Sequence, residues 1–301
     1  MIGISVIVPV FNQAGRLGDC LDALLRQDVP AGSFEVIVVD NGSGDESMAV
    51  ARQRPAVRLL EESRRSAYAA RNRGIRAARG SLIAFTDADC IARPDWLSRL
   101  QERLVDDSEA MVVMGRDIPT GPSAAIRLLG LYDHYKEIFA LSNEDPTVYY
   151  GHTNCMMARR ELFDQLGFLD ERPRGADVIF VQHVLRRHGT RAVQYVPAAV
   201  VRHMEVSSAP VYFKKAFIYG RSARSYRQVV PARPLRNRER LLIFRNVVRD
   251  GKLSAPEQGY LLMLLALGVA AYCLGWLAPW RARVSPPPPA GPPPSPSRET
   301  E

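Results

Sequence analysis

The sequence predicts an α/β fold with a doubly wound, mostly parallel sheet, followed by a C-terminal helical, membrane-associated extension. Over the first 205 residues, short runs rich in Val and Ile alternate with segments of helical hydrophobic spacing. This alternation is typical of parallel strands buried between helices. Residues 258–280 then form an uncharged run of 23 residues. As a helix, such a run is long enough to cross a bilayer core.

The individual elements follow from local patterns. Residues 4–10 and 35–40 are apolar and β-branched, which favours strands, and Leu residues between them repeat at helical spacing. Residues 66–79 are rich in Ala and Arg and predict a helix with Gly80 as its C-cap. The same patterns predict strands at 81–86, 110–114 and 191–196, and a helix at 94–105 with Pro in its first turn.

The positive charge is concentrated in one segment. The formal net charge is +8, but residues 201–250 hold 12 Lys and Arg against 3 Asp and Glu. Basic and aromatic residues alternate within it, which is compatible with nucleic-acid binding, a solvated helix face or a surface for anionic lipids. Because the apolar run at 258–280 follows, we favour the anionic membrane surface as the partner and expect no nucleic acid.

These patterns divide the chain into four regions. We expect an α/β domain at 1–205, a basic and mostly helical juxtamembrane segment at 206–257, a transmembrane or membrane-embedded helix at 258–280, and a Pro-rich disordered tail at 281–301. A buried core helix is the alternative for 258–280. The four cysteines form no close pair, which argues against a disulfide framework. The N-terminus is typical of a strand and not of a signal peptide, so we expect the cytoplasmic face of the cell membrane.

Acidic residues fall at the ends of the predicted strands. Asp40 ends one strand, while Asp87 and Asp89 flank Ala88 directly after another. Ligands of doubly wound sheets bind beyond these carboxyl ends, and paired carboxylates there favour a divalent cation bound with phosphates. An Asp-x-Asp pattern alone is a weak signal, because a turn or a helix N-cap explains it equally well.

In their order along the chain, several motifs resemble those of family 2 glycosyltransferases, which are inverting enzymes with the GT-A fold. They are Val-Ile-Val-Pro-Val-Phe-Asn at 6–12, Val-Val-Asp-Asn-Gly-Ser at 38–43, Ala-Arg-Asn-x-Gly at 70–74, Phe-Thr-Asp-Ala-Asp at 85–89, Arg-Arg-Glu-Leu-Phe at 159–163 and Gly-Phe-Leu-Asp-Glu at 167–171. The resemblance covers about residues 3–205 and implies that the domain at 1–205 is the GT-A catalytic domain. It implies a nucleotide-sugar donor, with UDP the expected nucleotide, and a Mn²⁺ or Mg²⁺ cofactor.

The resemblance also implies a role for each matching residue. The implied metal ligands are Asp89 and His203. His152 and Asn154 would face the donor sugar or the acceptor. The implied nucleotide and donor contacts are Pro9, Val10, Phe11, Asp40, Arg71, Asp87 and Ala88.

The implied general base is Asp177. Relatives commonly carry an acid before this aspartate and another two residues after it, where this chain has Ala176 and Ile179. One carboxylate suffices to take a proton from an acceptor hydroxyl. A helix N-terminal carboxylate is the alternative role for Asp177.

We therefore expect a glycosyltransferase that acts on a lipid-linked or cell-surface glycan precursor in cell-envelope polysaccharide biosynthesis. The Gln-x-x-Arg-Trp motif of processive relatives is missing, so a single transfer per encounter is expected. Two other functions stay open. A catalytically impaired nucleotide-sugar-binding scaffold is motivated by Ala176 and Ile179. A sugar-nucleotide nucleotidyltransferase would need a Gly-rich activated loop, which residues 12–16 match poorly.

Overall fold

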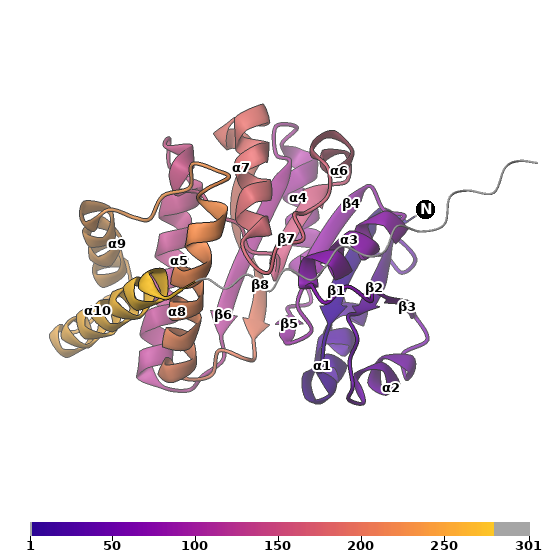
Figure 1. Cartoon of the computed structure of the whole chain (residues 1–301), viewed down its shortest axis with the longest axis horizontal. Coiled ribbons are helices and arrows are strands. Elements are labelled where there is room, and N and C mark those ends of the chain that lie inside the picture. The colour runs from indigo at the N-terminus through magenta and orange to yellow at the C-terminus, as the bar shows by residue number, and fades with distance from the viewer. Residues whose placement is uncertain (1, 280–301) are drawn as a thin grey trace, which may run out of the picture.

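The computed structural model describes residues 2–279 and centres on one eight-stranded sheet (Figure 1). Its first four strands in sequence order are parallel: β1 (Ile4–Val10), β2 (Phe34–Asp40), β3 (Val57–Glu61) and β4 (Leu82–Thr86). They lie in the order β3-β2-β1-β4. This half of the sheet confirms the predicted doubly wound arrangement, with its carboxyl ends at one edge.

The other half of the sheet is mixed. β7 (Cys155–Arg159) is antiparallel to both β4 and β6 (Val112–Pro119), and β8 (Val193–His203) is parallel to β6. The short β5 (Cys90–Ala92) pairs antiparallel with β8, with Cys90 opposite His203. The strands predicted at 110–114 and 191–196 are thus longer than expected, and His203 ends a strand instead of following one.

Helices cover both faces of the sheet, because strand side chains alternate between the faces. Val6 and Val8 of β1 pack toward α1 (Ala14–Leu25), α2 (Ser47–Arg52) and α4 (Trp96–Asp106). Ile7 packs on the opposite face, toward α3, α6 and α7. These three helices span Ala67–Ala77, Glu161–Leu166 and Ala176–His188.

The start of α3 agrees with the prediction and its end does not. Ser66 is the N-cap, and its hydroxyl accepts a hydrogen bond from the backbone N–H of Ala69. The helix ends at Ala77 with Ala78 as the cap, so Gly80 is not the C-cap. Gly80 instead lies against β1, where an added Cβ would approach the backbone nitrogen of Ser5 to 2.7 Å. Close approach to β1 explains the glycine.

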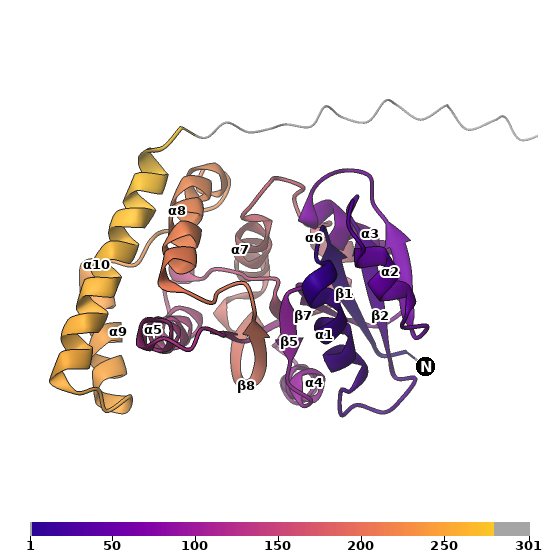
Figure 2. The same ribbon diagram turned by 90° about the horizontal axis from the view of Figure 1, so that it is seen from below.

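Four helices form a separate layer at the C-terminal side: α5 (Ala124–Leu141), α8 (Ala209–Tyr226), α9 (Asn237–Asp250) and α10 (Ala255–Leu277). They share a hydrophobic core that is distinct from those of the sheet. Figure 2 shows α10 at the outer edge of this layer, alongside α8. The remaining helical turns are η1 (Pro146–Val148) and η2 (Thr190–Ala192). The predicted tail at 281–301, and Trp280, lie outside the described residues.

The helix α10 is apolar and mostly faces outward. Among residues 2–279 it is the one helix that length and composition would allow to cross a membrane, with a mean hydropathy of 2.0 over its most apolar stretch. Only 17% of that stretch is buried, which is consistent with a membrane-associated extension. Gly220 of α8 lies against the carbonyl of Tyr272, and Gly275 of α10 lies against that of Phe217. The two helices therefore pack with their backbones in contact.

Candidate active site

The loop after β4 directs its two carboxylates to different partners. The backbone N–H of Cys90 donates to the carbonyl of Asp87 and closes the loop into a turn. Asp87 forms an ion pair with Arg71 of α3. Asp89 is buried, and its Oδ2 lies 3.4 Å from Nε2 of His203 at the end of β8. The carboxylates of one Asp-x-Asp motif thus face two different elements.

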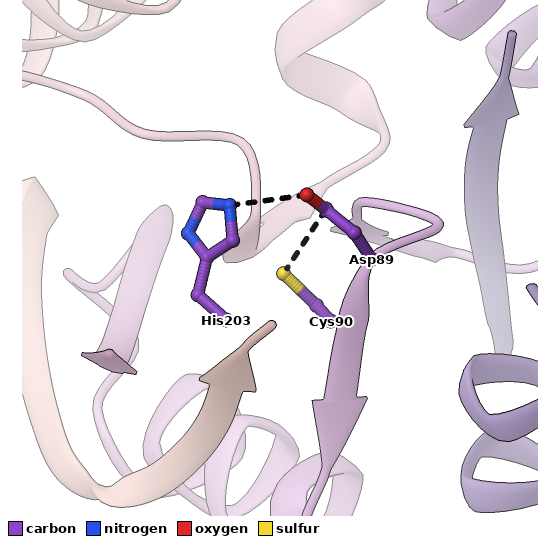
Figure 3. A group of neighbouring side chains, drawn as sticks. All are labelled: Asp89, Cys90 and His203. Atoms are coloured by element: carbon purple, nitrogen blue, oxygen red, sulfur yellow. Dashed lines mark hydrogen bonds and ion pairs between the residues drawn. The ribbon is translucent and has the colours of Figure 1, made fainter. Parts of the chain in front are cut away.

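Asp89, Cys90 and His203 form the one group of three or more His, Cys, Asp or Glu side chains within residues 2–279 that is spaced to hold a metal ion (Figure 3). Their ligand atoms lie within 4.8 Å of one another. A carboxylate oxygen and an imidazole nitrogen suit a divalent cation such as Mn²⁺. Burial raises the pKa of the Cys90 thiol well above its ordinary value, which opposes formation of a thiolate ligand. Asp89 and His203 therefore fit the implied metal.

His203 is surrounded by charged groups. Its Nδ1 lies 3.0 Å from Oδ2 of Asp117, and its Nε2 lies 3.2 Å from Nζ of Lys215. Lys215 also pairs with Glu205 at 2.7 Å. Burial disfavours the charged imidazole, but hydrogen bonds to Asp117 and Asp89 outweigh it and raise the pKa of His203 to about 10. A metal at Nε2 must therefore displace a proton.

His152 and Asn154 belong to a series of hydrogen-bonded polar side chains that leads to His203. The amide nitrogen of Asn154 donates to Oδ2 of Asp117 at 2.6 Å, and its Oδ1 lies 3.0 Å from Nδ1 of His152. Nε2 of His152 in turn lies 3.4 Å from Oε1 of Glu137 on α5. Burial raises the pKa of Glu137 to about 7. The amide of Asn154 is therefore occupied by protein partners.

Asp177 lies in the first turn of α7. Its Oδ1 accepts a hydrogen bond from the backbone N–H of Val178 at 3.0 Å, and the hydroxyl of Tyr68 also hydrogen-bonds to it. Burial raises the pKa of Asp177 above its ordinary value, although these hydrogen bonds and Arg71 oppose the rise. A raised pKa makes a carboxylate a stronger base. Ala176 and Ile179 are both buried, so an ionised acid at either position would lose its favourable hydration.

Arg71 connects this carboxylate to the loop after β4. Its side chain is only 5% exposed, and its guanidinium lies 5.4 Å from the ring centre of Tyr68 while pairing with Asp87. A series of contacts thus runs from Asp87 through Arg71 and Tyr68 to Asp177. Tyr68 was not among the site residues predicted from the sequence. Its spacing of three residues from Arg71 on a predicted helix is the signal that could have identified it.

The residues assigned to the nucleotide differ in what they present to a ligand. The side chain of Val10 is buried in the core, whereas Phe11 is 44% exposed with the guanidinium of Arg65 5.1 Å from its ring centre. Pro9 precedes them in β1 and is partly buried, and Ala88 is buried. Phe11 is therefore the apolar side chain of this group that offers surface to a base.

Asp40 and Asn41, at the end of β2, have different hydrogen-bond partners. Oδ1 of Asp40 accepts a hydrogen bond from the backbone N–H of Ser43 at 3.0 Å, and the carboxylate stays partly exposed. The amide of Asn41 donates to the carbonyls of Glu62 and Arg64 at 3.0 and 2.7 Å. An aspartate at position 41 has no donor for these carbonyls, so the amide fits this environment better.

Comparison with known proteins complements this geometry. Residues 5–167 match the family model described as Glycosyl transferase family 2. The chain is 42% identical to the glycosyltransferase AglE of Haloferax volcanii over 101 residues, which cover 32% of this chain and 33% of that protein. It is 34% identical to the glycosyltransferase GlyG of Streptococcus pneumoniae over 117 residues, covering 37% and 38% of the two chains. The matches thus span little more than a third of these relatives.

Solved structures share the fold. The mannosyltransferase PcManGT of Pyrobaculum calidifontis, in complex with GDP-Man and Mn²⁺, aligns with a TM-score of 0.63 at 20% identity, covering 89% of this chain and 85% of that one. TarS of S. aureus, in complex with UDP-GlcNAc, aligns with a TM-score of 0.54 at 17% identity, covering 90% of this chain and 82% of that one. Glucosyl-3-phosphoglycerate synthase of Mycobacterium tuberculosis, in complex with Mn²⁺, UDP-Glc and phosphoglyceric acid, aligns with a TM-score of 0.51 at 22% identity. The alignment covers 67% of this chain and 71% of that one. These similarities confirm the fold predicted from the sequence.

Proposed function

The chain belongs to glycosyl transferase family 2, and on this premise we propose that it catalyses a single inverting transfer of a sugar from a nucleoside-diphosphate sugar to an acceptor hydroxyl. The observation that carries the proposal is the series of contacts Asp87–Arg71–Tyr68–Asp177. It joins acids at the carboxyl ends of the strands to Asp177, a partly buried carboxylate with a raised pKa. A donor site and a base in one place are what this reaction needs.

In this proposal Asp177 takes the proton of the acceptor hydroxyl, which then attacks the anomeric carbon of the donor sugar. The configuration inverts because the base and the leaving diphosphate lie on opposite faces of the sugar. Asp89 and His203 would hold a Mn²⁺ or Mg²⁺ ion, which would supply Lewis-acid stabilisation of the leaving nucleoside diphosphate. Arg71 keeps Asp87 in place beside the donor and adds positive charge near the diphosphate.

For the donor, we propose a uridine diphosphate sugar. Proteins of the same fold were solved with UDP-GlcNAc, UDP-Glc and GDP-Man, so the shared chemistry is a sugar linked to a nucleoside diphosphate. The exposed ring of Phe11 can stack on the base, and the free oxygen of Asp40 can accept a hydrogen bond from the base or ribose.

We further propose that the C-terminal helices hold the enzyme at an anionic membrane surface on the cytoplasmic face, where it meets a lipid-linked or cell-surface glycan precursor. Apolar side chains of α10 such as Leu262 and Leu267 are about half exposed. The basic helix α8 packs directly against α10. Apolar burial combined with attraction between Lys or Arg and anionic lipids is typical of membrane-surface helices. Flotation with phosphatidylglycerol-containing vesicles tests this, and Leu262→Glu with Leu267→Glu should reduce binding.

The central test is a screen of nucleotide sugars by thermal shift with Mn²⁺, followed by product analysis with candidate acceptors. A tight donor should raise the melting temperature by mass action. The expected product is a nucleoside diphosphate together with a glycosylated acceptor of inverted configuration. Release of pyrophosphate would instead indicate a nucleotidyltransferase. Donor binding without turnover on any acceptor would support a scaffold.

A further inference from the structure

Asp117 lies beside His203, with its side chain partly buried, because of the mixed half of the sheet. β6 and β8 run parallel, and a register shift at Gly115 and Arg116 places Asp117 opposite Val201. His203 lies two residues further along β8 and therefore on the same face as Val201. Asp117 and His203 are thus diagonal neighbours, and Nδ1 of the imidazole lies 3.0 Å from Oδ2 of the carboxylate.

The hydrogen-bond roles in this contact follow from the chemistry of the groups. An ionised carboxylate can only accept, so the Nδ1–H of His203 donates to Asp117. The amide nitrogen of Asn154 lies 3.3 Å from the same Nδ1 but only 2.6 Å from Oδ2 of Asp117. Asn154 therefore donates to Asp117. Its orientation agrees with His152, whose Nδ1 lies 3.0 Å from the amide oxygen.

We propose that Asp117, oriented by Asn154, is the positioning residue that makes His203 a metal ligand. By accepting the Nδ1–H, Asp117 fixes the ring and leaves Nε2, which faces Asp89, as the nitrogen that binds the cation. Such a carboxylate behind a metal-bound histidine sets the tautomer and increases the basicity of the ligand. This inference rests on the proposed function, because it requires the metal to bind at Asp89 and His203.

The hydrogen bonds of Asp117 and Asn154 set this role apart from ordinary packing. Those described for the two side chains form one connected network with His152 and His203. The network reaches only the nitrogen of His203 that points away from Asp89. It therefore acts on the metal through the imidazole, which it orients and polarises.

The test measures Mn²⁺ affinity of the full chain without donor, by the electron paramagnetic resonance signal of free Mn²⁺. Asp117→Asn keeps the size of the side chain and should weaken Mn²⁺ binding by about 10- to 100-fold. Asp117→Leu should weaken it further. Asp106→Asn, on the exposed side of α4, is the control and should change nothing. Binding of UDP without metal and the melting temperature of the metal-free protein report on structural damage.

A second measurement uses the unaltered protein. Side-chain ¹H–¹⁵N spectra with Zn²⁺, assigned through His203→Gln, should show His203 protonated at Nδ1 and metal-bound at Nε2. The inference is overturned if Zn²⁺ binds at Nδ1 of His203 or if Asp117→Asn binds Mn²⁺ with an affinity within twofold of the wild type. It is also overturned if the metal-free UDP affinity of Asp117→Asn falls by as much as its Mn²⁺ affinity. If the wild-type protein itself binds no Mn²⁺ at His203, the metal part of the proposed function fails instead.

Discussion

The ammonium group of Lys215 lies 3.2 Å from Nε2 of His203, the imidazole nitrogen that faces Asp89. Lys215 belongs to α8, beyond the residues 5–167 that match the family model. A helix of the C-terminal extension thus places a positive charge beside the candidate metal ligands. The same helix packs against α10 through Gly220. The electrostatics of the site therefore depend on the extension and not only on the family region.

Lys215→Met should strengthen Mn²⁺ binding in the absence of donor. The ammonium repels an incoming divalent cation, and at ~4 Å this repulsion is on the order of 1 kcal/mol or more, so we expect a gain of roughly fivefold. Titration calorimetry on the full chain measures it. Lys214→Met removes an exposed neighbouring charge on α8 and serves as the control. Weaker binding by Lys215→Met would contradict the repulsion.

Metal affinity should rise with pH. With a pKa of about 10, metal-free His203 holds a proton at neutral pH that the cation must displace. Affinity should therefore increase by about tenfold per pH unit between pH 7 and pH 9 and level off near the pKa of His203. Calorimetry in buffers of different ionisation enthalpy should detect release of one proton per bound ion. His203→Gln should lose this proton release, and a pH-independent affinity would argue against His203 as a ligand.

Asp177→Asn should slow transfer strongly and keep donor binding. The amide cannot take a proton, so we expect the rate to fall by about 10²- to 10⁴-fold, while the affinity for the nucleotide sugar changes little. Single-turnover assays and calorimetry separate the two effects. Asp164→Asn, on the exposed side of α6, is the matched control. Transfer at the wild-type rate by Asp177→Asn would remove it as the base.

Tyr68→Phe should lower kcat and move its acidic limb to higher pH. The variant keeps the ring beneath Arg71 and loses the hydroxyl, whose hydrogen bond lowers the pKa of Asp177. The pKa of Asp177, already raised by burial, should therefore rise further, and the base should be protonated up to a higher pH. A pH–rate profile measures the shift. Tyr260→Phe, on the exposed side of α10, is the control, and an unchanged profile for Tyr68→Phe would show that the hydroxyl is not coupled to the base.

Gly220→Ala and Gly275→Ala should each destabilise the C-terminal layer. Alanine normally stabilises a helix interior by about 1 kcal/mol relative to glycine. At these two positions, however, the new Cβ would overlap a backbone carbonyl of the partner helix. The melting temperature should therefore fall, and vesicle binding should weaken if α8 and α10 act together. Gly259→Ala, where a Cβ meets nothing within 4 Å, should raise the melting temperature slightly. Equal effects at all three positions would contradict the close packing.

Local signals predicted the parts of the fold that depend on near neighbours. The strand at residues 4–10 and the start of the helix predicted from residue 66 are correct because hydrophobic runs and helix propensity involve residues a few positions apart. The prediction of Gly80 as a C-cap was wrong because the glycine is required by its close approach to β1, which is distant from it in the sequence. The roles assigned to Asp177, Asp89 and the other site residues stay predictions, although the structure shows which of them lie together.

The sequence by itself determined the family, the α/β order of elements and the positions of the acids at the strand ends, because ordered motifs and periodicity are properties of the chain. Only the tertiary structure decided the surroundings of those acids. Asp117 meets His203 across 86 positions, and Tyr68 meets Gly175 across 107. These contacts depend on the order of strands and on a register shift between β6 and β8. Sheet order arises from packing of the whole domain, and no local stretch of sequence encodes it.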